Sequence, residues 1–386
     1  MRRLGMGLVA AVTALVAVAP SADAEAGRWT EPTCATVDSP GSLTYTNDEG
    51  ATLKPTSTAM TPTTYAFGLS ALDTPNTLVA VQEYSKPGGG PVEPTVLRST
   101  DAGCHWTTIG ALKDGWVLET VAAPGGRTYL WPAGSGENLY LVTGTTITPR
   151  PIPAGIAGRM AGFGVDRRNG SVVRFVDTAG QTYVSTDAGR TWTKRGVPIG
   201  GEYSLYRAAF DPADLNHVVV GTGSNGAYVT FDGGVTWTQS SGLDLTPAGR
   251  LGVNVFTAAV SPANRNVVYA MGLDIDQADA HDPSDGRHLY RSTDGGRTFA
   301  PIVDQNPDVT LPNGPLLAPS PVDPGVLYFV FGMNYGGYGT DLYKWTAATG
   351  QVTKTHNAYD EISSIAFNPA HPNVMYLGLA SEPDGV

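Results

Sequence analysis

Charged residues are scarce in this sequence of 386 residues: they make up 15% of it, and lysine and arginine together number 24. So few basic residues exclude a protein that binds nucleic acid mainly through positive charge. The low charged fraction also excludes a coiled coil and a disordered polyelectrolyte. The formal net charge of −11 instead predicts a protein that repels phosphate and attracts cations or basic surfaces.

Motifs of common cofactor and nucleophile sites are missing as well. The sequence has no glycine-rich phosphate loop, no His/Glu zinc pattern and no Gly-x-Ser-x-Gly elbow, and its six histidines are scattered. Helical periodicity is sustained nowhere, whereas 48 glycines and 29 prolines supply many turns. We therefore expect an all-β fold that needs no cofactor.

The first 24 residues have the pattern of a secretory signal peptide. Arg2 and Arg3 precede an uncharged run from Leu8 to Ala19, which is too short to span a bilayer. The small-residue triplet Ala22-Asp23-Ala24 follows, and we expect cleavage directly after it. No later segment is apolar enough to anchor the chain, so the sequence predicts a secreted protein.

The sequence has only two cysteines, Cys34 and Cys104, and both follow the expected cleavage site. An even number of cysteines in an exported protein usually forms a disulfide, and the C-x-x-C pair of a metal or redox site is absent. We expect a disulfide between them; two free thiols are the alternative.

An eight-residue pattern, S-x-D-x-G-x-T-W, recurs along the chain. It reads STDAGCHW at 99–106, STDAGRTW at 185–192, TFDGGVTW at 230–237 and STDGGRTF at 292–299, with a weaker copy, TNDEGATL, at 46–53. In a tight hairpin the aspartate accepts backbone N–H bonds, glycine supplies a positive φ, and the aromatic ring can pack between sheets. We interpret these residues as scaffold and not as a catalytic site: Asp48, Asp101, Asp187, Gly189, Trp192, Asp232, Gly234, Trp237, Asp294, Gly296 and Phe299.

The spacing of these aspartates indicates seven repeat units. The gaps are 53, 86, 45 and 62 residues, and the gap of 86 fits two units of 43. The hidden unit lies around 128–142, and a seventh unit at 342–350 keeps the glycine without the aspartate. Four short strands per unit, at a period near the ~40–50 residues of propeller repeats, predict a single seven-bladed β-propeller of four-stranded antiparallel blades over residues 25–386.

The two ends of the sequence fit one shared blade. The last unit has only two strands, and the first box has no upstream half of its own. We expect the N- and C-terminal strands to share a blade, which would close the propeller, leave no free sheet edge and make the chain complete.

At these repeats the sequence resembles the Asp-box (bacterial neuraminidase repeat) propellers. This superfamily includes sialidases, xyloglucanase-type glycoside hydrolases, sortilin-type receptors and plant-type photosystem II assembly factors. The resemblance covers essentially the whole mature chain and implies the fold, but a fold hosts many activities. In overall character the sequence is most similar to secreted, single-propeller bacterial proteins that bind a protease.

A sialidase of this superfamily should carry an Arg-Ile-Pro string near its start and three arginines that gather on the substrate carboxylate. The nearest string here, Arg150-Pro151-Ile152-Pro153, is interrupted and lies in the middle of the chain. Four other arginines precede or occupy the boxes and have scaffold positions: Arg98, Arg190, Arg291 and Arg297. The sequence therefore does not favour sialidase activity.

The candidate binding residues are aromatic and lie in loops on the face opposite the boxes, where a scaffold supports variable segments. They are Tyr84, Trp116, Tyr203, Tyr206, Tyr335, Tyr338 and Tyr359. Tyrosine and tryptophan are favoured at protein interfaces and also stack on sugars. Packing between blades is an equally good interpretation for any single ring.

The alternative function is a glycoside hydrolase of the exo-sialidase or xyloglucanase type. It would use paired carboxylates from the same loops, for which the candidates are Glu83, Glu202, Asp360 and Glu361. Hydrolysis needs two of them about 5–10 Å apart, one with a raised pKa. Solvated surface acids are the more common meaning of such residues.

The densest acidic cluster is a candidate for structural calcium, through Asp274, Asp276, Asp279 and Asp282, although its spacing does not match an EF-hand loop. We expect no other metal. The sequence as a whole predicts a secreted, monomeric, non-enzymatic protein that recognises another extracellular protein, with a protease as the candidate partner and carbohydrate as the alternative. It predicts binding neither to nucleic acid nor to membranes.

Overall fold

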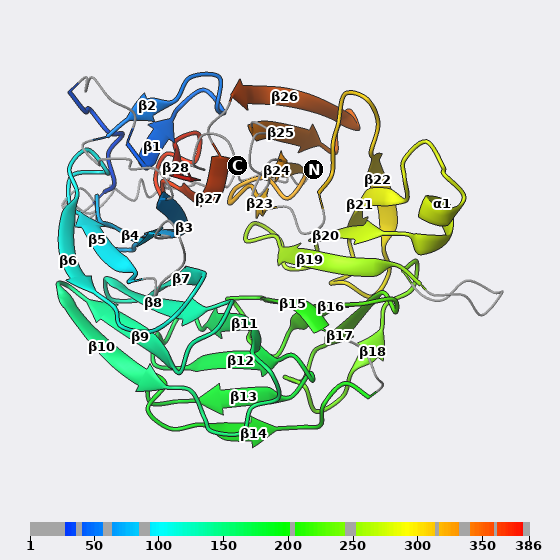
Figure 1. Cartoon of the computed structure of the whole chain (residues 1–386), viewed down its shortest axis with the longest axis horizontal. Coiled ribbons are helices and arrows are strands. Elements are labelled where there is room, and N and C mark those ends of the chain that lie inside the picture. Colours follow the sequence, from blue (N-terminus) through cyan, green and yellow to red (C-terminus); the bar gives the residue numbers. More distant parts are fainter. Residues whose placement is uncertain are drawn as a thin grey trace, which may run out of the picture.

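The computed structural model describes residues 28–35, 41–56, 64–84, 93–200, 205–243, 252–312, 316–331, 340–358 and 361–380. Within these residues the chain is all-β except for one short helix, α1 (Ile275–Asp279) (Figure 1). The predicted all-β class is confirmed. In the described part of the chain no helix is long and apolar enough to cross a membrane. The predicted signal peptide, 1–24, lies outside the described residues.

Five four-stranded antiparallel sheets follow one another in chain order (Figure 1). The first contains β7 (Leu118–Ala123), β8 (Arg127–Pro132), β9 (Asn138–Thr143) and β10 (Thr146–Pro151). The second contains β11 (Met160–Val165), β12 (Val173–Asp177), β13 (Thr182–Ser185) and β14 (Thr193–Arg195). The third contains β15 (Leu205–Phe210), β16 (Val218–Thr222), β17 (Ala227–Thr230) and β18 (Thr238–Gln239). The fourth contains β19 (Asn254–Val260), β20 (Val268–Leu273), β21 (Arg287–Ser292) and β22 (Ala300–Asp304). The fifth contains β23 (Leu317–Pro319), β24 (Val326–Phe331), β25 (Thr340–Thr346) and β26 (Gln351–Ala358).

The remaining strands form one eight-stranded sheet that joins both ends of the described chain. It contains β1 (Leu43–Thr46), β2 (Lys54–Pro55), β3 (Thr64–Ala71), β4 (Leu78–Tyr84), β5 (Thr95–Ser99), β6 (Thr107–Ala111), β27 (Glu361–Phe367) and β28 (Met375–Ala380). β1 pairs antiparallel with β28, so that Leu43 lies opposite Gly378. With β2 and β27 these strands make the four-stranded unit expected from the two ends.

This terminal unit is continuous with the sheet of β3 to β6. β28 also meets β3 through a single residue pair, Ala380 and Tyr65, which merges two expected blades into one hydrogen-bonded sheet. The described strands therefore form six hydrogen-bonded sheets. The finer prediction of seven separate blades in a closed ring stays a prediction.

Each Asp box is a hairpin between the third and fourth strands of its unit. In the box at 185–192, the backbone N–H of Thr191 donates to Oδ1 of Asp187 at 2.9 Å, and the Thr191 hydroxyl donates to Oδ2 at 2.7 Å. The Ser185 hydroxyl donates to the same carboxylate at 2.8 Å and accepts from the N–H of Gly189. The hydrogen bond from the Thr191 hydroxyl, with the others, holds the pKa of Asp187 well below its usual range. These hydrogen bonds close the hairpin around the aspartate.

The box at 99–106 differs from the others because His105 replaces the usual threonine. Its ring Nδ1 lies 2.5 Å from Oδ2 of Asp101, where the other boxes place a threonine hydroxyl. The backbone N–H of His105 donates to Oδ1 of the same aspartate at 2.9 Å. The hairpin therefore tolerates histidine at this position because imidazole can reach the same carboxylate oxygen.

In four of the five boxes the last residue is aromatic and packs into the core between neighbouring sheets; the box at 46–53 ends in Leu53. The Trp192 ring meets Phe175 edge-on with centroids 4.9 Å apart. Trp237 packs against the cluster that contains Val176 and Val218, which belong to adjacent sheets. Phe299 is 6% exposed within a similar cluster. These rings hold neighbouring sheets together by burying apolar surface, as the sequence predicts.

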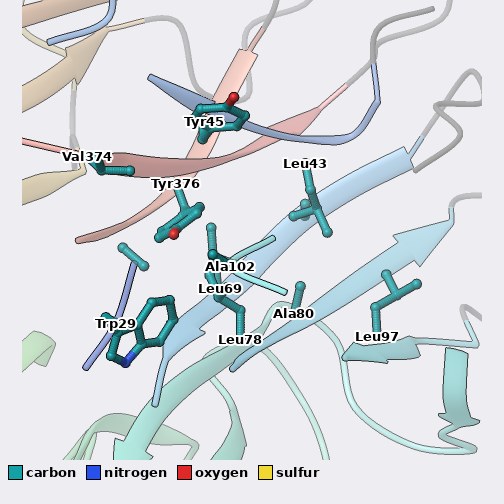
Figure 2. Close-up of a cluster of buried hydrophobic side chains, with 12 residues drawn as sticks. Trp29, Leu43, Tyr45, Leu69, Leu78, Ala80, Leu97, Ala102, Val374 and Tyr376 are labelled. Atoms are coloured by element: carbon teal, nitrogen blue, oxygen red, sulfur yellow. The ribbon is translucent and has the colours of Figure 1, made fainter. Parts of the chain in front are cut away.

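An N-terminal segment, 28–35, fastens the terminal unit to its neighbour. Cys34 and Cys104 form a disulfide, so the alternative of two free thiols is wrong. Trp29 is 4% exposed, and its indole N–H donates to the carbonyl of Leu72 at 2.9 Å. Figure 2 shows Trp29 beside Tyr376 in one cluster that residues from both chain ends share.

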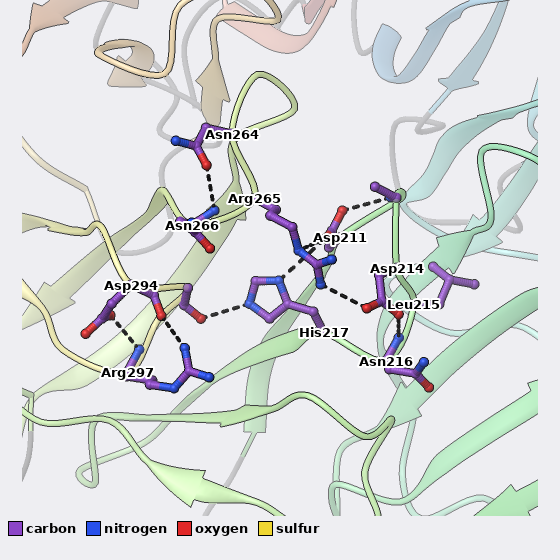
Figure 3. A network of polar contacts seen from close by, with 12 residues as sticks. Asp211, Asp214, Leu215, Asn216, His217, Asn264, Arg265, Asn266, Asp294 and Arg297 are labelled. Atoms are coloured by element: carbon purple, nitrogen blue, oxygen red, sulfur yellow. Dashed lines mark hydrogen bonds and ion pairs between the residues drawn. The ribbon is translucent and has the colours of Figure 1, made fainter.

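A polar network links the third and fourth sheets on the side of the boxes (Figure 3). Nε of Arg265 donates to Asp211 and one of its terminal nitrogens donates to Asp214, both at 2.9 Å. His217 is 1% exposed, and its Nε2 lies 2.8 Å from the carbonyl of Gly295. Burial tends to raise the pKa of Asp211, but His217, the backbone N–H of Ala213 and Arg265 lower it overall. The network therefore holds turns of two sheets together.

Candidate functional site

The two ends of the sheets carry different kinds of segment. Because each four-stranded sheet is a simple meander, the boxes and the turns between first and second strands lie at one end. The other end carries the links between sheets and the loops between second and third strands. We call this second end the loop face; it includes the segments 112–117, 133–137, 152–159, 178–181, 223–226 and 274–286.

A hollow of about 1120 Å³ opens on the loop face. It lies where segments of the first, second and third sheets meet. Its lining residues are Asp114, Pro132, Gly134, Ser135, Gly136, Glu137, Ile152, Ile156, Gly158, Arg159, Met160, Thr178, Leu205 and Tyr206. Ligand sites are concave, combine apolar surface with placed polar groups, and measure about 300–1,000 Å³.

Asp114 holds one wall of the hollow. Its carboxylate accepts hydrogen bonds from the backbone N–H of Glu137 at 3.1 Å and from both the backbone and side-chain nitrogens of Asn138 at 3.0 Å. The Tyr140 hydroxyl donates to the Asp114 carbonyl at 3.3 Å. Burial, and next the negative charge of Asp114, raise the pKa of Tyr140 to about 12. Asp114 therefore fastens the link 112–117 to the start of β9.

Trp116 stands at the edge of the hollow and is 43% exposed. Its backbone N–H donates to the Ser135 carbonyl at 2.8 Å, and its carbonyl accepts from the N–H of Gly134 at 3.1 Å. The ring lies directly against Gly134, where an added Cβ would stand 2.7 Å from the ring carbon Cδ1. Only glycine leaves room for this approach, so the loop fixes where Trp116 is presented.

A buried carboxylate holds the backbone beside Trp116. Glu83 is 2% exposed, and its two oxygens accept from the N–H groups of Val117 at 3.0 Å and Leu118 at 2.5 Å. Val117 has a φ of 53°, a left-handed conformation that is unfavourable for a β-branched residue. Burial raises the pKa of Glu83, while the two N–H donors act in the opposite direction. Glu83 therefore stabilises a strained turn.

An ion pair lies near the hollow on the strands closest to the centre of Figure 1. Arg207 of β15 pairs with Glu119 of β7, across β11 of the sheet between them. The guanidinium carbon of Arg207 also lies 5.8 Å from the centre of the Trp131 ring. Both side chains are half-buried, so the pair links the first and third sheets directly.

The structure brings two of the predicted aromatic residues to the hollow. Tyr206 lines it, and Trp116 lies against the lining residue Gly134. Of Tyr84 the structure describes only the backbone at the end of β4. The other predicted aromatic residues, Tyr203, Tyr335, Tyr338 and Tyr359, lie outside the described residues.

The carboxylates of the alternative hydrolase prediction are placed only in part. Glu83 is buried and fully occupied by backbone N–H groups. Glu202 and Asp360 lie outside the described residues, and of Glu361 only the backbone in β27 is described. The paired-acid arrangement therefore stays a prediction.

Sequence reasoning missed most of the residues that line the hollow. Ile152, Ile156 and Arg159 come from the link before β11, and Met160 is the first residue of β11; the interrupted string at 150–153 did not indicate a hollow there. The only available signal was the glycine-rich stretch Pro132-Ala133-Gly134-Ser135-Gly136, which marks a loop but not what the loop faces.

Two carboxylates of the acidic segment considered for calcium accept hydrogen bonds from neighbouring residues. Asp274 caps α1 by accepting from the N–H of Gln277 at 3.1 Å. Asp282 accepts from the N–H and the hydroxyl of Ser284. Across the ranges that the structure describes, no group of three or more His, Cys, Asp or Glu side chains is arranged to hold a metal ion. We therefore assign no calcium site to this segment.

Comparison with known proteins confirms the resemblance predicted from the repeats. The BNR/Asp-box repeat model matches residues 183–194. The dispase autolysis-inducing protein of Streptomyces mobaraensis is 48% identical over 385 residues, which cover 98% of this chain and 98% of that protein. Xyloglucanase Xgh74A of Acetivibrio thermocellus is 27% identical over 51% of this chain, and the match spans only 24% of that enzyme.

Two solved structures share the fold. The GH74 xyloglucanase from Xanthomonas campestris has a TM-score of 0.54 and 19% identity, over 77% of this chain and 48% of that one. A YCF48 protein, described as bound to a D1 peptide, has a TM-score of 0.53 and 11% identity, over 90% of this chain and 100% of that one. At these identities the two structures support the propeller-like architecture alone.

Proposed function

The chain belongs to the family of the dispase autolysis-inducing protein, and from this premise we propose that it is a secreted, non-enzymatic binding protein whose partner is an extracellular protease. The observation that carries the proposal is identity of 48% over nearly the full length of both chains. At this identity a shared fold and a related surface are expected. The name of that relative connects it to the autolysis of dispase.

The geometry of the loop face supports binding rather than hydrolysis. Of the candidate acids whose side chains are described, Glu83 is buried and accepts two backbone N–H groups. Asp114, which lines the hollow, is likewise occupied by neighbouring N–H donors. The exposed ring of Trp116 and the ring of Tyr206 are the kind of side chains that contribute most to protein interfaces.

We further infer that residues 25–386 form one seven-bladed propeller closed by the terminal unit, and that residues 1–24 are removed on secretion. The pairing of β1 with β28 and the contact of β28 with β3 support closure. The disulfide between Cys34 and Cys104 supports an oxidising, extracellular location.

Dispase itself is the probe that tests this proposal. We expect purified 25–386 to bind catalytically inactive dispase in biolayer interferometry, and to accelerate the loss of intact active dispase on gels. The heat-unfolded protein is the control and should do neither. Absence of both binding and accelerated loss would contradict the proposal.

The alternative, a glycoside hydrolase, is supported by the similarity to xyloglucanases. We expect no release of reducing ends from xyloglucan or from aryl glycosides. Turnover by the wild type that disappears in Glu202→Gln or Glu361→Gln would establish the alternative and assign its carboxylates.

A further inference from the structure

The hollow on the loop face has a mixed lining, with apolar and polar surface in nearly equal amounts. Pro132, Ile152, Ile156, Met160 and Leu205 contribute apolar surface. Such a lining fits an occupant that offers a large apolar side chain together with a polar or charged group.

Two polar side chains of the lining are already occupied within the protein. Asp114 accepts from the N–H groups of Glu137 and Asn138. The Thr178 hydroxyl donates to the carbonyl of Ala157 at 2.8 Å. These groups shape the hollow and offer little further hydrogen bonding to a ligand.

The charge of the lining is slightly negative. It contains the carboxylates of Asp114 and Glu137 and the guanidinium of Arg159. Glu137 and Arg159 are exposed, and neither forms a side-chain ion pair with another residue that the structure describes. The whole chain has a formal net charge of −11. This field attracts a basic group placed next to the hollow.

Trp116 is held in place at the edge of the hollow before any partner arrives. The strained φ of Val117, the N–H bonds to buried Glu83 and the close approach of Gly134 fix the turn. Strained backbone that the surrounding structure enforces is a recurring feature of ligand sites. A rigid aromatic anchor also loses little conformational entropy on binding.

Resting on the proposed function, the geometry points to the hollow and Trp116 as a receptor site for one extended segment of the protein partner. That segment carries a large apolar side chain, which enters the hollow, and a basic residue beside it, which meets Glu137. The Trp116 ring covers the segment from the edge. Trp116 and Glu137 contact the segment and act in no chemical step.

The first test is the affinity for catalytically inactive dispase, measured by biolayer interferometry. Trp116→Ala should weaken binding at least about tenfold, the range of an interface hot spot, without changing the melting temperature. Val322→Ala is the matched control, because Val322 is 66% exposed but lies in the turn between β23 and β24 on the opposite end of the sheets. The control should bind within about twofold of the wild type.

Two charge variants test the basic neighbour, and only one of them is expected to weaken binding. Glu137→Gln should weaken binding about two- to fivefold, and Arg159→Gln should strengthen it or leave it unchanged. Raising the salt concentration should reduce the difference between them. Weaker binding by Arg159→Gln would overturn the assignment of a basic neighbour.

The chemistry of the occupant is tested with an array of overlapping dispase peptides and with xyloglucan oligosaccharides. Peptides retained by the wild type and lost by Trp116→Ala should contain a large apolar residue next to lysine or arginine. Unchanged dispase binding by Trp116→Ala would overturn the inference while leaving the proposed function intact. Oligosaccharide binding that depends on Trp116 would identify a sugar site and overturn it as well. A wild type that does not bind dispase would instead contradict the proposed function, and with it the partner class assumed here.

Discussion

The buried carboxylate of Glu83 shows why an acid on the loop face need not be a catalytic group. Both of its oxygens accept N–H groups of a turn more than thirty residues further along the chain. Nothing in the spacing of the sequence relates these positions. In the sequence, an exposed acid of a variable loop therefore cannot be distinguished from a buried acid that binds backbone N–H groups.

Replacing Glu83 by glutamine should change the pH dependence of stability. Burial raises the pKa of Glu83 overall, so the native state binds the proton more tightly than the unfolded chain does. The contribution of Glu83 is then fully present below the ordinary carboxyl pKa of 4.5 and is lost as the pH rises through the raised value. The free energy of unfolding of the wild type should fall relative to Glu83→Gln over this window. Urea denaturation between about pH 4 and pH 8 measures the difference, and a constant difference would refute the assignment.

An Asp-box carboxylate should show the opposite dependence. Burial tends to raise the pKa of Asp232, but hydrogen bonds from Thr236 and Thr230 lower it to about 2. Its contribution is present above the ordinary value of 3.8 and is lost as the pH falls towards 2. Asp232→Asn keeps the shape and loses an acceptor, so we expect a loss of about 1–2 kcal/mol at pH 7. In the same denaturation assay, the free energy of unfolding of Asp232→Asn should fall less on acidification than that of the wild type.

The box residues were predictable because each box is local: donor and acceptor lie within four positions of each other, as Asp187 and Thr191 do. The disulfide was predictable from the even number of cysteines in a sequence with a signal-peptide pattern and no C-x-x-C pair. By contrast, the left-handed φ of Val117 had no signal in the sequence, because a β-branched residue adopts it only when distant groups enforce it.

The N-terminal segment 28–35 acts as a strap across two units of the terminal sheet. Besides the disulfide, it accepts a hydrogen bond at the Thr30 carbonyl from Asn368, in the turn between β27 and β28. The N–H of Thr30 donates to Asn76, in the turn between β3 and β4. One short segment thus ties the turns of two neighbouring units.

Removing the disulfide should therefore loosen the junction of the chain ends. The double variant Cys34→Ala/Cys104→Ala frees a loop whose ends are 70 residues apart in sequence, so we expect a loss of about 2–4 kcal/mol. Thermal unfolding followed by circular dichroism measures the loss. Reductant added to the wild type should reproduce it, and reductant added to the double variant should have no effect; equal stability of both proteins would refute the role of the strap.

Strand content followed from patterns within each unit, including the hidden unit, where β8 and β9 are runs of apolar residues without an Asp box. The short helix α1 was not predicted from the sequence pattern. Its five residues lie in the acidic segment that suggested calcium, and Asp274 caps it through a single hydrogen bond. A helix this short has too few residues for periodicity to show it.

The terminal unit should be required for the whole molecule to fold. β28 is entirely buried, and Leu377 has no exposed surface. A chain that starts at Thr64 lacks the strap, β1 and β2 and leaves one edge of β28 unpaired. We expect a loss of more than about 4 kcal/mol together with aggregation, measured by denaturation and size-exclusion chromatography. A chain that starts at Glu25 is the control and should be unaffected; a monomeric, cooperatively folded Thr64 variant would contradict the prediction.

The repeat period predicted the order of the sheets, because each unit forms mainly from its own residues. It could not predict that two units merge through Ala380 and Tyr65, since that contact depends on how the ends meet in space. The hollow was also beyond prediction. Its lining comes from segments of three sheets, and only their packing places Asp114, Arg159 and Tyr206 around one space.

The pairing of β1 with β28 also sets an order of events during folding. Leu43 and Gly378 are more than three hundred residues apart in sequence, so their contact carries a large entropic cost of loop closure. Each middle sheet can form from its own residues. The pairing of β1 with β28 can form only when the two ends of the chain come together. Refolding should consequently end in a slow step that joins the two ends, and until then β1 is paired on one edge only, with β2.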